Sequence, residues 1–142
     1  MAGDPYRDDA IWDTWSESVI TIHFDDGHEV RAGSGPLPWT GVTHVVTAWN
    51  PGETRSRGEN LVANEHLRDV LDSRGLAHRL AVGSSPDGTW SEDGFAVTGL
   101  SRADATQLGR DFGQMAIYEI DGSTVVIVDC AGGRVIPTNV GT

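Results

Sequence analysis

Two glutamates are the residues of this sequence best suited to acid/base chemistry. Glu59 and Glu92 each lie in a polar segment that is rich in turn-forming residues. Two carboxyl groups held about 5–9 Å apart can act as acid and base, as they do in glycoside hydrolysis. We expect a raised pKa for a carboxyl group that does this work in a partly buried site. Glu59 and Glu92 are therefore the candidate catalytic residues.

Amide, indole and guanidinium side chains provide the candidate ligand-binding groups. Amides and carboxylates suit a polar, hydrogen-bonding metabolite such as a nucleotide-like or sugar-like compound, and we expect Arg55 or Arg57 to meet an anionic group on it. Structural roles also explain these residues singly, since Glu59 and Asn60 can cap a helix and Gln114 can tie a strand end to a loop. The candidate set is Trp49, Asn50, Arg55, Arg57, Asn60, Trp90 and Gln114.

Metal ions and cofactors find no support in the sequence. The five histidines have no close ligand spacing, and the single cysteine, Cys130, excludes an internal disulfide and any zinc site built on paired cysteines. Neither a phosphate-binding loop nor a nucleophile elbow occurs. We therefore expect no metal and no cofactor.

The excess of acidic over basic residues indicates which partners the protein is suited to bind. The sequence has ten basic and 21 acidic residues, which gives a net charge of −11. Nucleic-acid binding depends on clustered positive charge, so a nucleic-acid partner is disfavoured. The first nine residues hold three aspartates and no apolar stretch, and no apolar run is long enough to span a bilayer. We expect a cytoplasmic protein without a membrane partner.

Hydrophobic periodicity and turn residues divide the chain into short elements within one domain, residues 1–142. Ile11, Trp12 and Trp15 have the spacing of a short helix. The further expected elements are a hairpin at 19–32, a strand at 42–49, a loop at 50–58, a helix over 63–75, strands at 77–83 and 95–100, a helix over 101–113, strands at 114–120 and 124–129, and a tail at 132–142.

The element order predicts both the fold and the place of the site. From residue 42 to residue 129 it is the order of a ferredoxin-like split βαβ sandwich, an α+β fold with an antiparallel sheet and two helices on one face. The hairpin and a C-terminal strand are additions to this core. In such a sheet the first two strands end, and the next two begin, at the same end of the sheet. We call this end of the sheet the rim, and we expect the candidate residues to lie together there.

Several separated motifs resemble a known family. They are Thr47-Ala48-Trp49-Asn50-Pro51, Glu59-Asn60, Gly83 with Asp87-Gly88, Trp90-x-Glu92 and Phe112-Gly113-Gln114-x-Ala116. In this order they resemble a family of short bacterial proteins known as domain-of-unknown-function family 3293, over about residues 42–120. The resemblance implies no reaction, but it supports the rim residues.

Two functions from different classes follow. The first is a small-molecule site at the rim, with Glu59 or Glu92 as general acid or base if the protein is an enzyme, which the residues leave open. The second is a protein-interaction module that docks a partner through a sheet edge or through Trp12 and Trp15. A concave pocket at the rim favours the first function, and a flat rim beside an exposed tryptophan patch favours the second.

Overall fold

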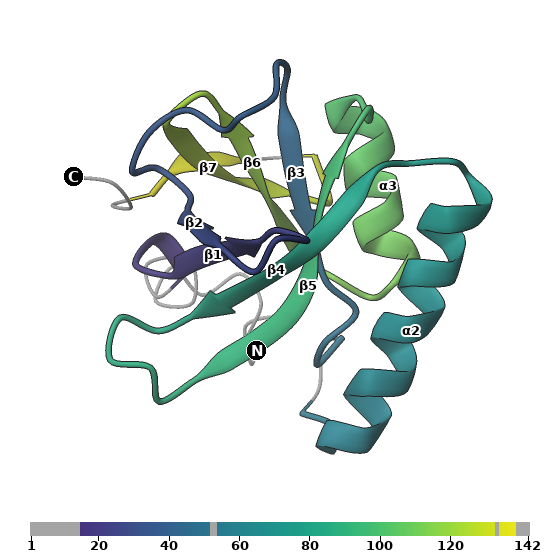
Figure 1. Cartoon of the computed structure of the whole chain (residues 1–142). Helices are drawn as coiled ribbons and strands as arrows, with labels where there is room; N and C mark the ends of the chain where they lie inside the picture. Colours follow the sequence, from purple (N-terminus) through teal and green to yellow (C-terminus); the bar gives the residue numbers. More distant parts are fainter. Residues whose placement is uncertain (1–14, 52–53, 133, 139–142) are drawn as a thin grey trace, which may run out of the picture.

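The computed structural model describes residues 15–51, 54–132 and 134–138, and within them it contains eight strands and two helices (Figure 1). The strands are β1 (Val19–His23), β2 (Glu29–Arg31), β3 (Thr43–Val46), β4 (His78–Ser84), β5 (Ser91–Thr98), β6 (Ala116–Asp121), β7 (Thr124–Asp129) and β8 (Val135–Pro137). The helices are α2 (Arg57–Ser73) and α3 (Arg102–Asp111). The predicted α+β class is confirmed.

All eight strands form one antiparallel sheet in the order β2-β1-β4-β5-β3-β6-β7-β8. The β1–β2 hairpin lies at one edge of the sheet, where the sequence placed an additional hairpin. In the middle, β5 and β6 flank β3, so the end of β3 lies next to the starts of β5 and β6. The strand pairing thus forms the rim on which the candidate residues depend.

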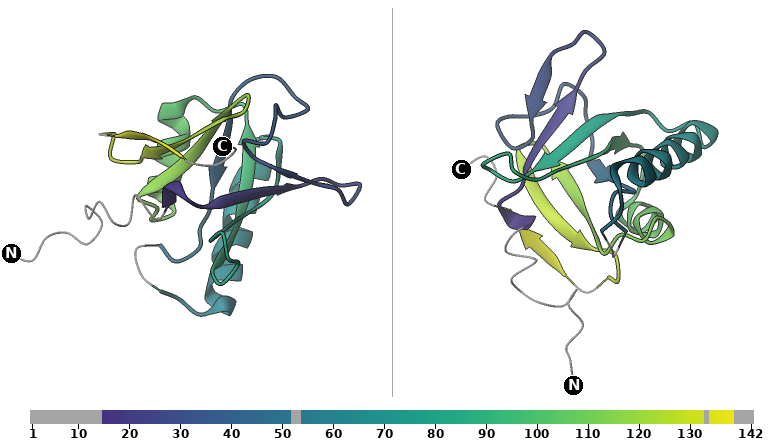
Figure 2. Two further views of the ribbon diagram at one scale, coloured as in Figure 1. Left: turned by 90° about the vertical axis from the view of Figure 1, so that its left-hand side faces the viewer. Right: turned by 90° about the horizontal axis from the view of Figure 1, so that it is seen from below.

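Both helices cover the same face of the sheet, and the sheet curls away from them (Figure 2). Strand residues alternate between two apolar cores, because successive side chains point to opposite faces. Val46 and Val97 pack in the core beneath the helices, with Leu67 of α2 and Leu108 of α3. The neighbouring strand positions supply a second core on the opposite face; among its members are Ile20, Ile22, Val45, Ala81, Ala96 and Ile120.

Helix α2 begins at Arg57, earlier than the apolar periodicity predicted. Ser56 is the N-cap, and its hydroxyl accepts a hydrogen bond from the Glu59 backbone amide, while the Glu59 carboxylate accepts one from the Ser56 amide. This reciprocal capping box satisfies two backbone donors and fixes the first turn. Residues 57 and 58, expected in the loop, are therefore helical. Helix α3 starts as predicted, with Ser101 as its N-cap.

The expected tail contains a strand. Residues 135–137 form β8, which pairs antiparallel with β7, so this part of the range 132–142 belongs to the sheet. The short helix expected from Ile11, Trp12 and Trp15 lies mostly outside the described residues. Neither helix of the described chain is both long and apolar enough to cross a membrane.

Candidate functional site

A cavity of about 300 Å³ lies at the rim, on the face of the sheet opposite the helices. It opens where β3 ends and where β5 and β6 begin. Five of the nine candidate residues take part in its lining: Trp49, Asn50, Trp90, Glu92 and Gln114. The structure thus brings together, on one concave surface, candidate residues from three segments that are far apart in the sequence.

The cavity exists because small residues occupy the sheet positions that form part of its lining. Ala81, Gly83, Gly94 and Ala116 line it and contribute little or no side chain. A Cβ atom added at Gly83 would have no other atom within 4 Å. Gly83 is also the residue of β4 paired directly with Glu92 of β5. The empty volume beside Glu92 therefore follows from a glycine in the sequence.

Glu92 is the only charged residue among the described residues of the lining. Burial raises the pKa of its carboxyl group from 4.5 to about 7, and a hydrogen bond from the Asn50 side chain opposes this effect. A carboxyl group with a pKa near neutrality holds its proton about half of the time at pH 7 and can act as acid or base. The raised pKa expected for a working carboxyl group is thus found at Glu92.

Asn50 is held in place by α2. Its backbone has a φ of 43°, in the left-handed region that asparagine tolerates better than most residues. Its Oδ1 atom accepts hydrogen bonds from the Arg55 backbone amide and from Asn60 Nδ2, both at 2.9 Å, and its own backbone amide donates to Asn60 Oδ1 at 2.8 Å. Because these bonds engage Oδ1, the Nδ2 group is the one presented to Glu92.

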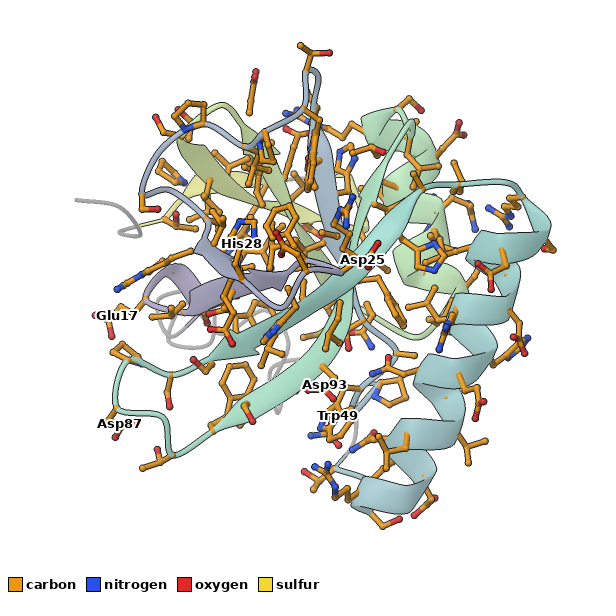
Figure 3. All side chains as sticks on the ribbon, viewed as in Figure 1. Glu17, Asp25, His28, Trp49, Asp87 and Asp93 are labelled. Atoms are coloured by element: carbon orange, nitrogen blue, oxygen red, sulfur yellow. The ribbon has the colours of Figure 1, made fainter. Side chains whose placement is uncertain are left out.

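Gln114 joins two loops at the rim. Its Nε2 group donates to the Trp49 carbonyl at 3.2 Å and to the Phe112 carbonyl at 3.4 Å. The preceding residue, Gly113, has a φ of +73°, and a Cβ there would lie 2.6 Å from the Cβ of Pro51. Figure 3 shows Trp49 on the segment that leads from β3 to α2. Contact between the two loops therefore holds the backbone at Trp49 in place.

Trp15 and Tyr118 also belong to the lining, although the sequence pattern predicts neither residue at the site. The Tyr118 hydroxyl donates to the Trp15 carbonyl at 3.2 Å. Burial raises the pKa of Tyr118 to about 12, so this phenol stays protonated at neutral pH. The sequence contains a signal for Tyr118, because Tyr118 lies two residues before Ile120 and therefore on the same face of β6, the face that packs away from the helices.

Four candidate residues lie outside the cavity lining. The exposed Glu59 carboxylate belongs to the capping box, and its hydrogen bonds with Ser56 lower its pKa, which is the opposite of what a general acid needs. The structure therefore gives no support to a Glu59–Glu92 pair. Asn60 is 1 % exposed and binds the backbone and side chain of Asn50. Arg55 and Arg57 are also absent from the lining.

A second asparagine of α2, Asn64, supports the rim and was not singled out in the sequence. Its Oδ1 atom accepts from the Ala48 amide at 2.9 Å, and its Nδ2 group donates to the Asp93 carbonyl at 2.7 Å. Asn64 therefore links the chain after β3 to β5, one residue from Glu92. No group of three or more potential metal ligands occurs in the described part of the chain.

One comparison identifies a family. A family model described as "Protein of unknown function (DUF3293)" matches residues 46–117, about half of the chain. The matched range runs from the end of β3 to the start of β6 and therefore holds Asn50, Glu92 and Gln114. No curated protein and no solved structure matches this chain.

Proposed function

Because this chain belongs to the DUF3293 family, whose description assigns no activity, we propose its function from the cavity: it binds a polar small molecule at the rim. The observation that carries this proposal is the position of Glu92, a carboxyl group with a pKa of about 7 in a concave site lined by tryptophans. Binding and catalytic sites are typically concave, largely apolar and furnished with a few convergent polar groups.

Each polar group of the site has a role in this proposal. Glu92 exchanges a hydrogen bond or a proton with the ligand, and it is the general acid or base if a reaction follows binding. The Asn50 amide positions the Glu92 carboxyl group and stabilises its charged form. Trp49 and Trp90 provide flat apolar surfaces for stacking. Gln114 is a positioning residue, because its amide holds the loop that carries Trp49.

The concave rim favours the small-molecule function over the protein-interaction module. Trp15, one of the two tryptophans expected on a docking patch, is half-buried and lines the cavity, and Trp12 lies outside the described residues.

We further propose that the chain is one domain and that β3 to β6 with α2 and α3 are a ferredoxin-like unit, on the strength of the strand order β4-β5-β3-β6. The cytoplasmic location and the lack of a nucleic-acid partner stay predictions.

A thermal-shift screen against nucleosides, sugars, amino acids and other polar metabolites tests the proposal, because a ligand that binds only the folded state raises the melting temperature. The matched control is Gly83→Val. The added side chain enters the space that is empty at Gly83, where the backbone φ is also compatible with valine. We expect at least one ligand that stabilises the wild type and not this variant. Equal stabilisation of both proteins by every hit, or no hit, contradicts the proposal.

A further inference from the structure

The lining of the cavity indicates the charge of its ligand. Three tryptophans, Trp15, Trp49 and Trp90, and the phenol of Tyr118 surround a site in which Glu92 carries the only charge among the described lining residues. The remaining polar side chains of the lining, Thr47, Asn50, Thr54 and Gln114, are uncharged. No arginine or histidine takes part in the described lining, so nothing there would neutralise an anionic ligand.

A cationic ligand fits both features of this surface. The faces of tryptophan and tyrosine rings attract a cation through their quadrupoles, and desolvation of the site strengthens this attraction. A buried carboxylate is stabilised when an opposite charge pairs with it, and Asn50 is its one described hydrogen-bond partner. A phosphate or carboxylate on the ligand would instead meet Glu92 as a like charge.

Resting on the proposed function, we infer that the rim cavity is selective for small organic cations, of the amine, guanidinium or quaternary-ammonium class. The cation lies against the indole faces and pairs with the Glu92 carboxylate. The net charge of −11 would also increase the local concentration of such ligands near the protein.

The pH dependence of binding follows from the groups that line the site. Glu92 must be ionised to pair with a cation, and its pKa in the empty cavity is about 7. Tyr118, the other titratable side chain of the described lining, stays neutral in this range because its pKa is about 12. A permanently charged cation should therefore bind more weakly at pH 5.5 than at pH 8.5, by up to about 30-fold. Neutral ligands should lack this dependence.

The test compares cations with neutral probes of the same shape by nuclear magnetic resonance titration. Choline is paired with 3,3-dimethyl-1-butanol, and butylguanidinium with butylurea. In the wild type at pH 8 we expect each cation to bind at least about tenfold more tightly than its neutral partner, which corresponds to about 1.4 kcal/mol. In Glu92→Gln, which keeps the shape of the side chain, this preference should fall several-fold, leaving only the part that the aromatic faces contribute.

Each other outcome has a defined meaning. If the neutral probes bind as tightly as the cations, or if anionic metabolites of the thermal-shift screen bind more tightly, the cation selectivity is wrong and the small-molecule site stands. If the preference for cations is as large in Glu92→Gln as in the wild type, the cation does not pair with Glu92 and the inference is wrong. If neither the matched probes nor any metabolite binds, the proposed function fails together with the inference.

Discussion

At the scale of single residues, the site depends on a carboxyl group that is kept from water without a described charged partner. Gly83 leaves open space beside Glu92, and burial raises the pKa of Glu92 to about 7. A group whose pKa is higher in the folded state than in the unfolded state destabilises the fold as the pH rises between the two values. Glu92 should therefore reduce the stability of the empty protein above pH 4.5.

Replacing Glu92 by glutamine should remove this loss of folding stability. We expect Glu92→Gln to unfold with a free energy up to about 3 kcal/mol higher than that of the wild type above pH 7, and the gain should shrink to almost nothing near pH 4. Urea denaturation at several pH values measures the difference. Glu65→Gln, on the exposed surface of α2, controls for the loss of one negative charge. A constant difference across this pH range would contradict the account.

Asn50 should lower the pKa of the Glu92 carboxyl group, which is opposite to the effect of burial. Asn50→Gly keeps the backbone freedom that a φ of 43° requires and removes the amide that hydrogen-bonds Glu92. We expect the pKa of Glu92 to rise above its wild-type value of about 7, because the charged form loses its stabilising partner. A carboxyl-carbon titration by nuclear magnetic resonance detects the shift. An unchanged or lower pKa would show that Asn50 does not act on Glu92.

At the scale of the elements, contacts between irregular segments assemble the rim. The loop after α3 lies against the loop after β3 at Gly113 and Pro51. Gly113→Ala should therefore destabilise the fold through the strain of a positive φ and through the close approach to Pro51. Gly122→Ala, at a φ of +60° with no atom within 4 Å, has the strain alone. We expect Gly113→Ala to cost at least about 1 kcal/mol more than Gly122→Ala in denaturant unfolding.

Equal costs for the two glycine variants would mean that the loop contact at Gly113 is easily displaced. Binding gives an independent result, because the contact also positions Trp49. We expect Gly113→Ala to weaken any ligand identified in the thermal-shift screen, and Gly122→Ala, in the β6–β7 turn, to leave its affinity unchanged.

Most of this arrangement was predictable from the order of the elements. The hairpins, both helices and the strand order around β3 follow from periodicity and turn residues, and the strand order alone collects Asn50, Glu92 and Gln114. The role of Glu59 was not decided by the sequence, because a carboxylate three residues after a serine suits both a capping box and a catalytic pair. The sequence pattern suggests a docking patch for Trp15 and not the rim, because its place at the rim depends on a tertiary contact with Tyr118.

At the scale of the whole molecule, the two ends of the sheet have different chemistry. The end opposite the rim holds Glu119, which accepts hydrogen bonds from Arg102 at 2.5 and 3.1 Å and from the buried His44 at 2.9 Å. These contacts join β6, α3 and β3. The Arg102 guanidinium, together with the weaker effect of His44, holds the pKa of Glu119 below 4.5. This end is built for stability, whereas the rim holds an acid that reduces it.

The network at Glu119 should stabilise the fold at neutral pH. A carboxyl group with a lowered pKa contributes stability above its unfolded value of 4.5, and the contribution is lost as the pH falls through the folded value. We expect Glu119→Gln to cost about 1–2 kcal/mol at pH 7, because the Arg102 partner is half-exposed and solvent screens the pair, and progressively less below pH 4.5. Acid unfolding followed by circular dichroism, again with Glu65→Gln as the control, measures the loss. A cost that does not decline in acid would exclude the ion pair as its source.

The most direct test of the account is the titration of Glu92 itself, because the proposed site requires a carboxyl group that exchanges its proton near neutral pH. Carbon-detected nuclear magnetic resonance of the labelled wild-type protein follows the side-chain carboxyl signals, and the signal absent from Glu92→Gln identifies Glu92. We expect a midpoint of about 7 for this signal. A midpoint close to the ordinary value of 4.5 would show that water solvates the carboxyl group freely, and the rim would then lose its claim to be the functional site.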